Sequence, residues 1–237
     1  MIDFHAHLLP RLDDGARNLK MSAAMLVESK RQGIEISVAT PHCYFDTDVE
    51  KTIKKRDKVY NKLIRYIEKR KIETPQIVLG FEVYLTEEVY QVKKLDELLI
   101  KGTNTMLVEM PREKWDDHVF ARLDFIAEKG YDIVLAHPER YMAIDGEEEY
   151  DRLFSYGFPG QLNAASVINP KTRDFSYRLI KEGRIKLFGS DAHNLGVRAN
   201  FMKIASELIS KNVGEEYINI FKSQAEYYLG LRAKDNL

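Results

Sequence analysis

Short runs of β-forming residues alternate with helix-period segments along the whole chain of 237 residues. The runs are rich in Val, Ile, Leu and Phe, and the segments between them place apolar residues at the i, i+3, i+4 spacing of one helix face. Seven runs are expected to form strands, at residues 2–4, 34–39, 77–81, 106–109, 133–136, 161–163 and 185–188. Apolar strands joined by helices are typical of a parallel sheet with covered faces.

Two architectures fit this alternation, a closed barrel and a doubly wound open sheet. Glycine stands shortly before three of the strands, at Gly33, Gly130 and Gly183, where it can end the preceding helix in the left-handed conformation. We predict an α/β barrel of about seven βα units, because ligand candidates at the ends of almost every strand converge only if those ends form a ring. No linker-like stretch or repeat interrupts the chain, so we expect one domain over residues 1–237.

Charge and composition exclude several kinds of partner. The chain has 36 Lys and Arg against 37 Asp and Glu, so no long-range positive field attracts a nucleic acid. Residues 50–71 are locally basic, with ten Lys and Arg against three Asp and Glu. We interpret this segment as a solvated helix face or as a surface that recruits an acidic phosphopeptide. No run approaches the ~18 apolar residues of a membrane span, and we expect a cytoplasmic protein without membrane insertion.

Most of the histidines stand where predicted strands end. Five of the six lie at the carboxyl end of a strand or directly after it: His5, His7, His42, His137 and His193. Glu82, Glu109 and Asp191 occupy the same kind of position. The carboxyl ends of strands are where α/β folds assemble their sites, and neutral imidazole is a common metal ligand. His118 is the exception, and we expect it at an exposed helix start.

Each of these residues, taken singly, has an ordinary structural explanation. His42 or His137 could be a core histidine bonded to backbone, Asp191 a helix N-cap, and Glu82 or Glu109 a partner of a basic side chain. Taken together, these explanations require many imidazoles and carboxylates to reach one end of successive strands by accident. Nitrogen and oxygen ligands without a cysteine cluster suit Mn, Fe, Zn or Co. The candidates exceed the needs of one ion, so we expect two or three ions with Glu82 as the bridging carboxylate.

Phosphate ester hydrolysis is the reaction that best fits such a site. Clustered divalent ions lower the pKa of a bridging water, polarise a phosphoryl oxygen and neutralise charge during an in-line displacement. The planar fork of arginine binds phosphate oxygens, and Arg140 and Arg198 each follow a candidate histidine closely, with a surface ion pair as the alternative role. Phosphocysteine chemistry uses a C-x5-R loop, which from Cys43 would require arginine at position 49. Val49 stands there, so we expect Cys43 to be a buried, inert thiol.

Seven short motifs follow one another through the chain. They are His5-Ala6-His7, Asp13-Asp14-Gly15, Thr40-Pro41-His42, Gly80-Phe81-Glu82-Val83-Tyr84, Val108-Glu109-Met110, Ala136-His137-Pro138-Glu139-Arg140-Tyr141 and Ser190-Asp191-Ala192-His193-Asn194-Leu195. Their order and spacing resemble the polymerase and histidinol phosphatase (PHP) superfamily, and most closely its bacterial protein-tyrosine phosphatases from capsule and exopolysaccharide loci. The resemblance implies a distorted seven-stranded (βα)7 TIM-like barrel of the PHP type, with three divalent metal ions, manganese or iron in use.

The resemblance also assigns roles to residues of this chain. By position it gives His5, His7, Glu82 and Asp191 to a first ion, Glu82, Glu109 and His137 to a second, and Asp14, His42 and His193 to a third. Asp14 comes from the resemblance alone, because it lies in the loop after the first strand. The phosphate-binding arginines of the family match Arg140 and Arg198. The implied substrate is phosphotyrosine on a cognate autophosphorylating bacterial tyrosine kinase that controls polysaccharide export.

The predicted function is therefore a metal-dependent protein-tyrosine phosphatase. A phenolate leaving group has a pKa of about 10 and an alkoxide one nearer water's ~15.7, so an aryl ester needs less help from a general acid. No obvious acid stands among the candidates, because arginine cannot usefully give up a proton. Two alternatives stay open: a histidinol-phosphate phosphatase with the same chemistry, and a non-catalytic barrel that keeps its ions for stability.

Overall fold

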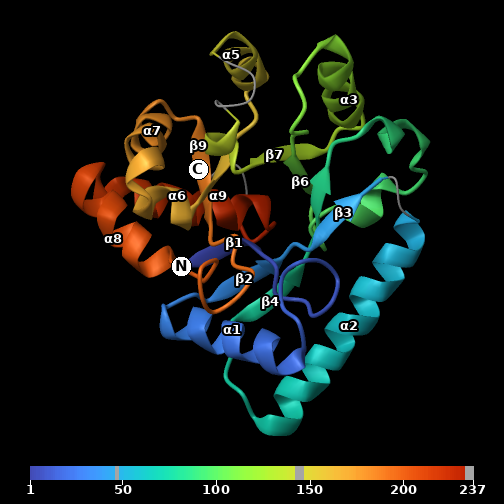
Figure 1. Cartoon of the computed structure of the whole chain (residues 1–237), viewed down its shortest axis with the longest axis vertical. Helices are drawn as coiled ribbons and strands as arrows, with labels where there is room; N and C mark the ends of the chain where they lie inside the picture. The colour runs from blue at the N-terminus through green and yellow to red at the C-terminus, as the bar shows by residue number, and fades with distance from the viewer. Residues whose placement is uncertain (46–47, 142–146, 233–237) are drawn as a thin grey trace.

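The computed structural model describes residues 1–45, 48–141 and 147–232. The strands are β1 (Ile2–Ala6), β2 (Ile36–Ala39), β3 (His42–Tyr44), β4 (Gln76–Leu79), β5 (Glu82–Tyr84), β6 (Thr105–Glu109), β7 (Asp132–Ala136), β8 (Gly160–Asn163) and β9 (Ile185–Gly189). The helices are α1 (Leu19–Arg31), α2 (Val49–Arg70), α3 (Asp117–Glu128), α5 (Glu147–Ser155), α6 (Ala164–Ile168), α7 (Pro170–Lys181), α8 (Met202–Asn212) and α9 (Glu215–Tyr228). Short 3-10 helices are η1 (Glu87–Gln91), η2 (Leu95–Leu98) and η3 (Pro138–Arg140). The helices surround the strands (Figure 1).

The strands of the described residues form two parallel sheets, in the orders β1-β2-β4 and β3-β5-β6-β7-β8-β9. The division arises because two passes of the chain are each interrupted. Thr40 and Pro41 separate β2 from β3, and Gly80 and Phe81 separate β4 from β5. Proline has no N–H to donate to a strand ladder, so it favours a break at this position. The break moves β3 and β5 out of the first sheet and into the second.

The α/β class with parallel strands agrees with the sequence prediction. The expected closed ring of seven strands is not observed as one sheet among the described residues, since the interrupted strands divide it in two. Two backbone hydrogen bonds nevertheless connect the outer strands: Asp191 N donates to His5 O at 2.8 Å, and His7 N donates to Ala192 O at 2.9 Å. The segment after β9 therefore lies against the end of β1, which brings together the carboxyl ends of both sheets.

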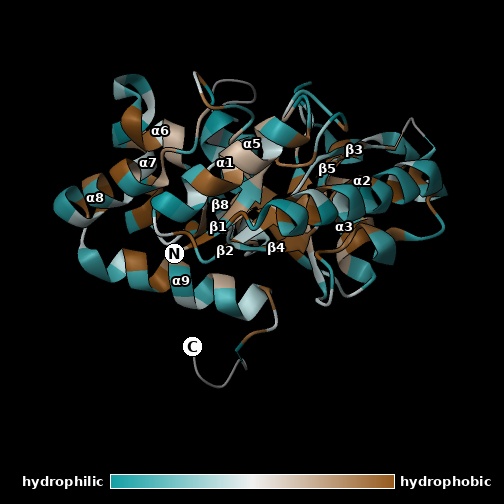
Figure 2. Ribbon diagram, turned by 90° about the horizontal axis from the view of Figure 1, so that it is seen from below, coloured by the Kyte–Doolittle hydropathy of each residue, from teal (hydrophilic) through white to brown (hydrophobic). Residues whose placement is uncertain are grey.

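The interior between the strands is apolar and closed at the end opposite these carboxyl ends. Fully buried side chains of five strands contribute to it: Phe4, Val38, Leu107, Val134 and Leu187. Helix α9 packs Ala225 and Leu229 against the same cluster and lies across that end of the strands (Figure 2). Removing these aliphatic and aromatic side chains from water stabilises the fold by roughly 1.5–3 kcal/mol for each of the larger ones. The polar ends of the strands are thus held on a rigid apolar base.

Three smaller expectations are also resolved. His118 is exposed in the first turn of α3, which Asp116 caps by accepting from His118 N at 2.9 Å, as predicted. Cys43 is a buried free thiol, and burial raises its pKa to about 12, as expected for an unreactive cysteine. Within the described ranges, no helix is both long and apolar enough to cross a membrane.

Candidate metal centre

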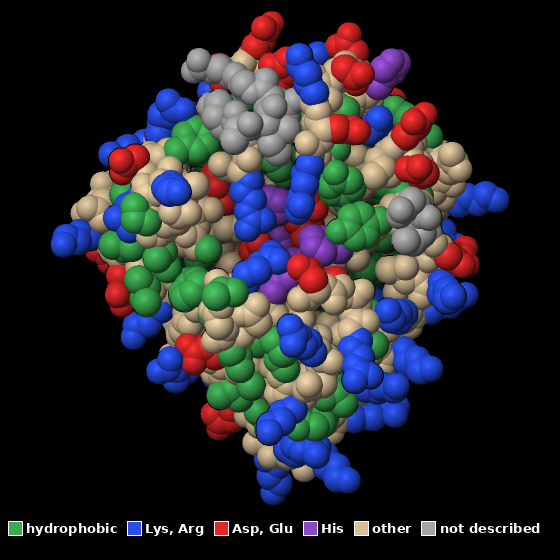
Figure 3. All heavy atoms as spheres, viewed as in Figure 1, with side chains coloured by type: hydrophobic (Ala, Val, Ile, Leu, Met, Phe, Trp, Pro, Cys, Tyr) green, Lys and Arg blue, Asp and Glu red, His purple; other side chains and the backbone are tan. Residues whose placement is uncertain are grey.

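All nine side chains predicted as ligands lie at or beyond the carboxyl end of a strand, although His42 and Glu82, which follow β2 and β4, are also the first residues of β3 and β5. His5 lies on β1, His42 on β3, Glu82 on β5 and Glu109 on β6, while His7, Asp14, His137, Asp191 and His193 follow strands in the connecting loops. A cavity of about 410 Å³ opens among them, and its lining includes Asp14, His42, Glu82, Glu109, His137 and Asp191. Figure 3 shows the histidines gathered near the centre of one face, surrounded by acidic and basic side chains.

The candidate ligand atoms form four groups within which all atoms lie within 4.8 Å of one another. The groups are His7, Asp14, His42 and His193; His5, Glu82 and His137; His5, His7 and Asp191; and His42, Glu82 and Glu109. The set that the family resemblance gives to a third ion, Asp14, His42 and His193, is together in the first group. His5, His7, His42 and Glu82 each appear twice, so the groups share side chains and form one continuous cluster.

Glu82 lies at the centre of this cluster. Its carboxylate is fully buried, with Oε2 at 3.2 Å from Nε2 of both His5 and His7 and at 2.9 Å from Nδ1 of His42. Its other oxygen, Oε1, lies 2.6 Å from His137 Nε2. The parallel pairing of β3 with β5 explains part of this geometry, because it sets His42 directly beside Glu82. Four imidazoles around one carboxylate is the arrangement that a bridging ligand requires.

A second layer of hydrogen bonds fixes the orientation of three imidazoles. The Nδ1 of His5 donates to Gln161 Oε1 at 2.8 Å, and that of His7 donates to Asp13 Oδ2 at 2.7 Å. The Nδ1 of His193 donates to a backbone carbonyl two residues earlier at 2.9 Å. In each ring this bond engages Nδ1 and directs Nε2, the nitrogen that could bind an ion, into the cluster. Such support is what a metal-binding imidazole needs from its surroundings.

Several buried polar atoms of the cluster have no hydrogen-bond partner among the described residues. They include His42 Nδ1, Glu82 Oε2 and His193 Nε2. These atoms are close to other nitrogen and oxygen atoms, as the 2.9 Å from His42 Nδ1 to Glu82 Oε2 shows, but their angles do not make hydrogen bonds. Because buried polar atoms in proteins are normally satisfied, unpaired nitrogen and oxygen atoms within this cluster fit bound cations. The nitrogen and oxygen donors suit Mn, Fe, Zn or Co.

The electrostatics of the cluster also favour cations. Burial opposes ionisation of Glu82, but the charge of His5 and the hydrogen bond from His137 hold the pKa of Glu82 well below its usual range. Burial and the neighbouring Glu82 charge raise the pKa of Glu109 to about 7. Two carboxylates this close cannot both remain charged without compensation by positive charge. A divalent cation supplies that compensation.

Both predicted arginines reach the rim of the cavity. Arg140 Nη2 donates to Asp191 Oδ2 at 2.7 Å, and Arg198 donates through Nη1 to Asp14 Oδ2 at 3.0 Å and through Nη2 to Asp191 at 3.3 Å. Their side chains are 41% and 38% exposed, so each retains donors that face the opening. Asp191 therefore contacts both guanidinium groups and holds them at the same edge of the site.

Sequence reasoning missed the residues that support the cluster. Asp13 and Gln161 orient imidazoles, and Asp3 holds the loop before Asp191 by accepting from Ser190 N at 2.8 Å. Arg112 also lines the cavity, with Nη2 3.7 Å from Glu109 Oε1. Asp13 carried a usable signal, because it directly precedes the candidate ligand in Asp13-Asp14-Gly15. The others are single polar residues with no distinctive spacing.

Comparison with known proteins agrees with this geometry. A family described as "Capsular polysaccharide synthesis, CpsB/CapC" matches residues 1–229. The chain belongs to the CpsB/CapC family. The tyrosine-protein phosphatase YwqE of Bacillus subtilis (strain 168) is 30% identical over 241 residues, covering 97% of this chain and 91% of that protein. The tyrosine-protein phosphatase CpsB of Streptococcus pneumoniae is 30% identical over 227 residues, covering 90% and 91%.

The fold of this CpsB/CapC member is also found in solved structures. The chain is similar to one from the crystal structures of YwqE from Bacillus subtilis and CpsB from Streptococcus pneumoniae, described as unique metal-dependent tyrosine phosphatases, with a TM-score of 0.83 at 27% identity over 98% of this chain and 96% of that one. The lactonase Lmo2620 from Listeria monocytogenes, with a TM-score of 0.56 at 10% identity, shares the fold alone. The family resemblance inferred from the motifs is therefore confirmed.

Proposed function

We propose that this chain is a metal-dependent protein-tyrosine phosphatase, a phosphoric monoester hydrolase that removes phosphate from phosphotyrosine. The convergence of nine imidazole and carboxylate side chains on one cavity with two arginines at its rim carries the proposal. Membership of the CpsB/CapC family supports it, because the similar curated proteins are named tyrosine-protein phosphatases. We further propose a cytoplasmic enzyme in which residues 1–237 make one domain and the interrupted strands follow a distorted seven-stranded ring.

We propose three divalent ions, with manganese as the resident metal and iron, zinc or cobalt as alternatives. His5, His7, Glu82 and Asp191 would hold one ion. Glu82, Glu109 and His137 would hold a second, and Asp14, His42 and His193 a third. When bound, such ions lower the pKa of a water, polarise a phosphoryl oxygen and neutralise developing charge. The four imidazoles around Glu82 support its place as the bridging carboxylate.

The arginines are assigned to the phosphate. Asp191 contacts both Arg140 and Arg198, at 2.7 and 3.3 Å, and so fixes two guanidinium groups at one edge of the cavity. Their remaining N–H donors would bind the non-bridging oxygens of the phosphate in a fixed geometry. Donors that need no rearrangement during the reaction stabilise the charge that develops in the transition state, an effect worth on the order of 10²–10³ in rate per donor.

An aromatic wall suits the phenyl ring of phosphotyrosine. Tyr44 lines the cavity with 40% of its surface exposed, and its ring centroid lies 5.6 Å from that of His42 and 5.6 Å from that of Tyr84. Aromatic rings prefer offset or edge contacts at these separations, so a substrate ring can pack beside Tyr44 while its phosphate reaches the arginines. The phenolate leaves readily, which reduces the need for a general acid.

The remaining sequence-based alternatives are less well supported. A histidinol-phosphate phosphatase would need the same cluster, but the curated relatives are named for tyrosine phosphatase activity. A non-catalytic scaffold does not explain two arginines held at the cavity edge. We propose a cognate tyrosine kinase of polysaccharide synthesis as the phosphorylated partner, since the family is described by its part in capsular polysaccharide synthesis.

Purified protein should be assayed with a phosphotyrosine peptide and with histidinol phosphate, before and after treatment with a chelator. We expect the peptide to be the better substrate, chelation to abolish its hydrolysis, and added Mn²⁺ to restore it. Alkylation of thiols is the control and should leave turnover unchanged, because Cys43 is buried. A strong preference for histidinol phosphate, or full activity without any metal, would overturn the proposal.

A further inference from the structure

A basic groove lies between α2 and the loop that follows β1. This hollow has a volume of about 610 Å³, and its apolar lining consists of Pro10, Leu19 and Val59. The cations that line it are Arg11, Lys20, Lys55, Lys58 and Lys62. All five cationic side chains belong to exposed residues, and no carboxylate lines the groove. The hollow therefore combines an apolar floor with a rim of positive charge.

None of these five cations makes an ion pair with a carboxylate of the described residues. Elsewhere on the surface such pairs are common, as in Arg31 with Glu28 at 2.8 Å and Arg184 with Asp151 at 2.7 Å. The whole chain has a net charge of −1, whereas the groove lining has five cations and no carboxylate, so positive charge is concentrated on this part of the surface. Clustered unpaired cations raise the local concentration of anionic partners and speed their association.

The helix arranges its lysines to face one partner. Lys55, Lys58 and Lys62 stand at positions i, i+3 and i+7 of α2 and therefore share one face with Val59, which lies in the groove lining. Figure 3 shows basic side chains gathered over α2, beside and below the histidine cluster. The basic run recognised in the sequence is thus partly a lined groove and not solely a solvated helix face.

The groove adjoins the metal cavity. Thr52 on α2 and Leu12 on the loop line the cavity, whereas Lys55 and Arg11, their near neighbours in the chain, line the groove. From Thr52 to Lys62 the helix rises by roughly 15 Å at 1.5 Å per residue. An extended peptide covers that distance with about four to five residues.

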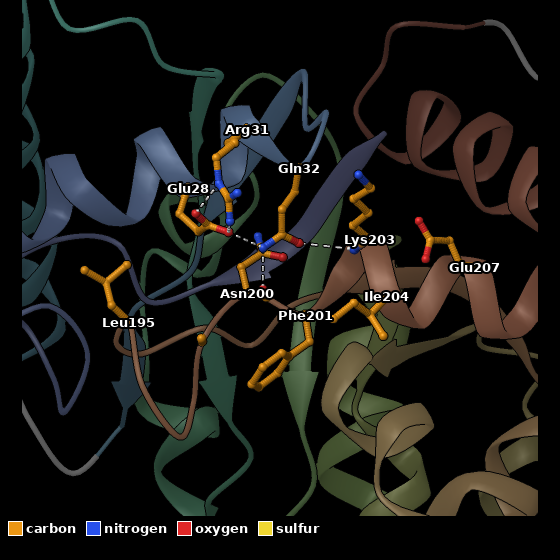
Figure 4. Close-up of a pocket in the computed structure, with 10 residues that line it drawn as sticks. Glu28, Arg31, Gln32, Leu195, Asn200, Phe201, Lys203, Ile204 and Glu207 are labelled. Carbon is orange, nitrogen blue, oxygen red and sulfur yellow. Dashed lines mark hydrogen bonds and ion pairs between the residues drawn. The ribbon is translucent and has the colours of Figure 1, made fainter.

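The other large hollow of the described surface differs in this respect. It has a volume of about 710 Å³ and lies between the end of α1 and the start of α8 (Figure 4). Its polar groups bond to one another: Arg31 Nε donates to Glu28 at 2.8 Å, and Gln32 Nε2 donates to Glu28 at 2.8 Å and to Asn200 O at 2.6 Å. That hollow has no comparable excess of unpaired charge.

We propose that the basic groove binds an acidic stretch of the phosphoprotein substrate, within about four to five residues to one side of the phosphotyrosine. This inference rests on the proposed phosphatase function, because the groove gains its meaning from a phosphotyrosine held in the adjoining cavity. Charge complementarity identifies the occupant as acidic. A concave hollow that adjoins the cavity fits a single extended chain better than the flat surface of an anionic membrane.

The test compares phosphotyrosine peptides that differ only in whether Asp and Glu or Asn and Gln flank the phosphorylated residue on either side. We expect one of the two acidic peptides, with Asp and Glu on the side of the phosphotyrosine that reaches the groove, to have a kcat/KM about 10-fold higher than its neutral counterpart at low salt. This factor is at the lower end of known electrostatic steering. The preference should disappear near 1 M salt, where the Debye length is ~3 Å. The Lys55→Glu, Lys58→Glu, Lys62→Glu triple variant should lose the preference while hydrolysing p-nitrophenyl phosphate within about twofold of wild type.

Two control variants show whether the effect depends on positive charge at the groove itself, and not on damage to the fold or on the net charge of the protein. Replacing the same three lysines with Arg should keep the preference, and reversing Lys171, Lys181 and Lys211 on α7 and α8 should leave it unchanged. A wild type that turns over both peptides equally, or a preference that survives reversal of the groove lysines, overturns the proposal. The proposal is also overturned if the triple variant loses binding to phosphatidylserine vesicles but turns over the acidic and neutral peptides as wild type does. That result would assign the groove to a membrane.

Binding of an unphosphorylated acidic peptide, followed by fluorescence anisotropy, tests the groove without catalysis. The proposal predicts weaker binding by the Lys→Glu triple variant than by wild type, and equal binding contradicts it. Failure of wild type to hydrolyse p-nitrophenyl phosphate would instead refute the phosphatase function, so the two failures are distinguishable.

Discussion

Asp13 offers a sharp test of how the cluster is held, because it orients imidazoles without lying among the nine candidate ligands. Its Oδ2 accepts from His7 Nδ1 at 2.7 Å and from His42 N at 3.1 Å, and its Oδ1 accepts from Gly15 N at 2.9 Å. Burial opposes the charge of Asp13, but the hydrogen bond and charge of His7 outweigh it and lower the pKa of Asp13 to about 2. The carboxylate is therefore ionised at neutral pH and supports His7 with a full charge.

The Asp13→Asn variant keeps the shape of this side chain and removes its charge. An amide has only one oxygen, so its NH₂ group must take the place of one carboxylate oxygen. In one rotamer the NH₂ group faces the N–H donors of His7 and His42, and in the other it faces the N–H of Gly15. The donors that it faces are left unpaired. A hydrogen bond to a charged group contributes about 1.5–3 kcal/mol. At 1.4 kcal/mol per factor of ten this loss corresponds to a drop of roughly 10- to 150-fold in metal affinity, in line with the ~10–100-fold typical of residues that orient metal ligands.

Metal affinity should be measured by titrating Mn²⁺ into chelator-treated protein and following phosphatase activity and heat of binding. The exposed Asp174 on α7 provides a matched control, because Asp174→Asn makes the same chemical change away from the site. Asp13→Asn with affinity within about twofold of wild type, or with a melting temperature so low that the fold is lost, would refute the orienting role.

Three further predictions concern the same site. Arg140→Ala should lower kcat/KM for a phosphotyrosine peptide by on the order of 10²–10³ while leaving metal content nearly unchanged, as elemental analysis can check. Cys43→Ala should retain wild-type turnover, and iodoacetamide should not inactivate the wild type, because burial raises the pKa of the thiol to about 12. Burial and the Glu82 charge raise the pKa of Glu109 to about 7, so below that pH a cation must displace a proton from Glu109 in order to bind. Metal affinity should therefore fall by up to about tenfold per pH unit between pH 7 and pH 5. An affinity that does not change with pH over this range would contradict the prediction.

The sequence carried most of the information on the fold because buried parallel strands have a simple signature. The pattern of apolar runs predicted the β6 to β9 region and β1 closely, since continuous burial leaves little room for another interpretation. It did not predict β3 and β5, which lie just after the second and third runs, beyond the breaks at Pro41 and Gly80. The consequence was a predicted closed ring where two sheets are found. The breaks depend on how neighbouring strands pair, which no local pattern encodes.

The candidate site was predictable for a related reason. Ligands such as His5 and Glu109 end apolar strands, where a polar residue is conspicuous, whereas Asp14 lies in a loop and was found through the family resemblance alone. Supporting residues such as Gln161 are identified by a contact with a residue 156 positions away, and such a contact has no sequence signature. The basic run of α2 was visible in the sequence, but its place beside the metal cavity depends on how the loop after β1 packs against it.

The central claim is that side chains from both sheets bind several ions around Glu82. Anomalous X-ray diffraction from crystals grown with Mn²⁺ tests it most directly, because peaks at the manganese edge locate each ion independently of any assumed ligand. The account predicts three peaks in the cavity, two of them within bonding distance of Glu82. An absence of peaks near all nine side chains in crystals of active enzyme would contradict it.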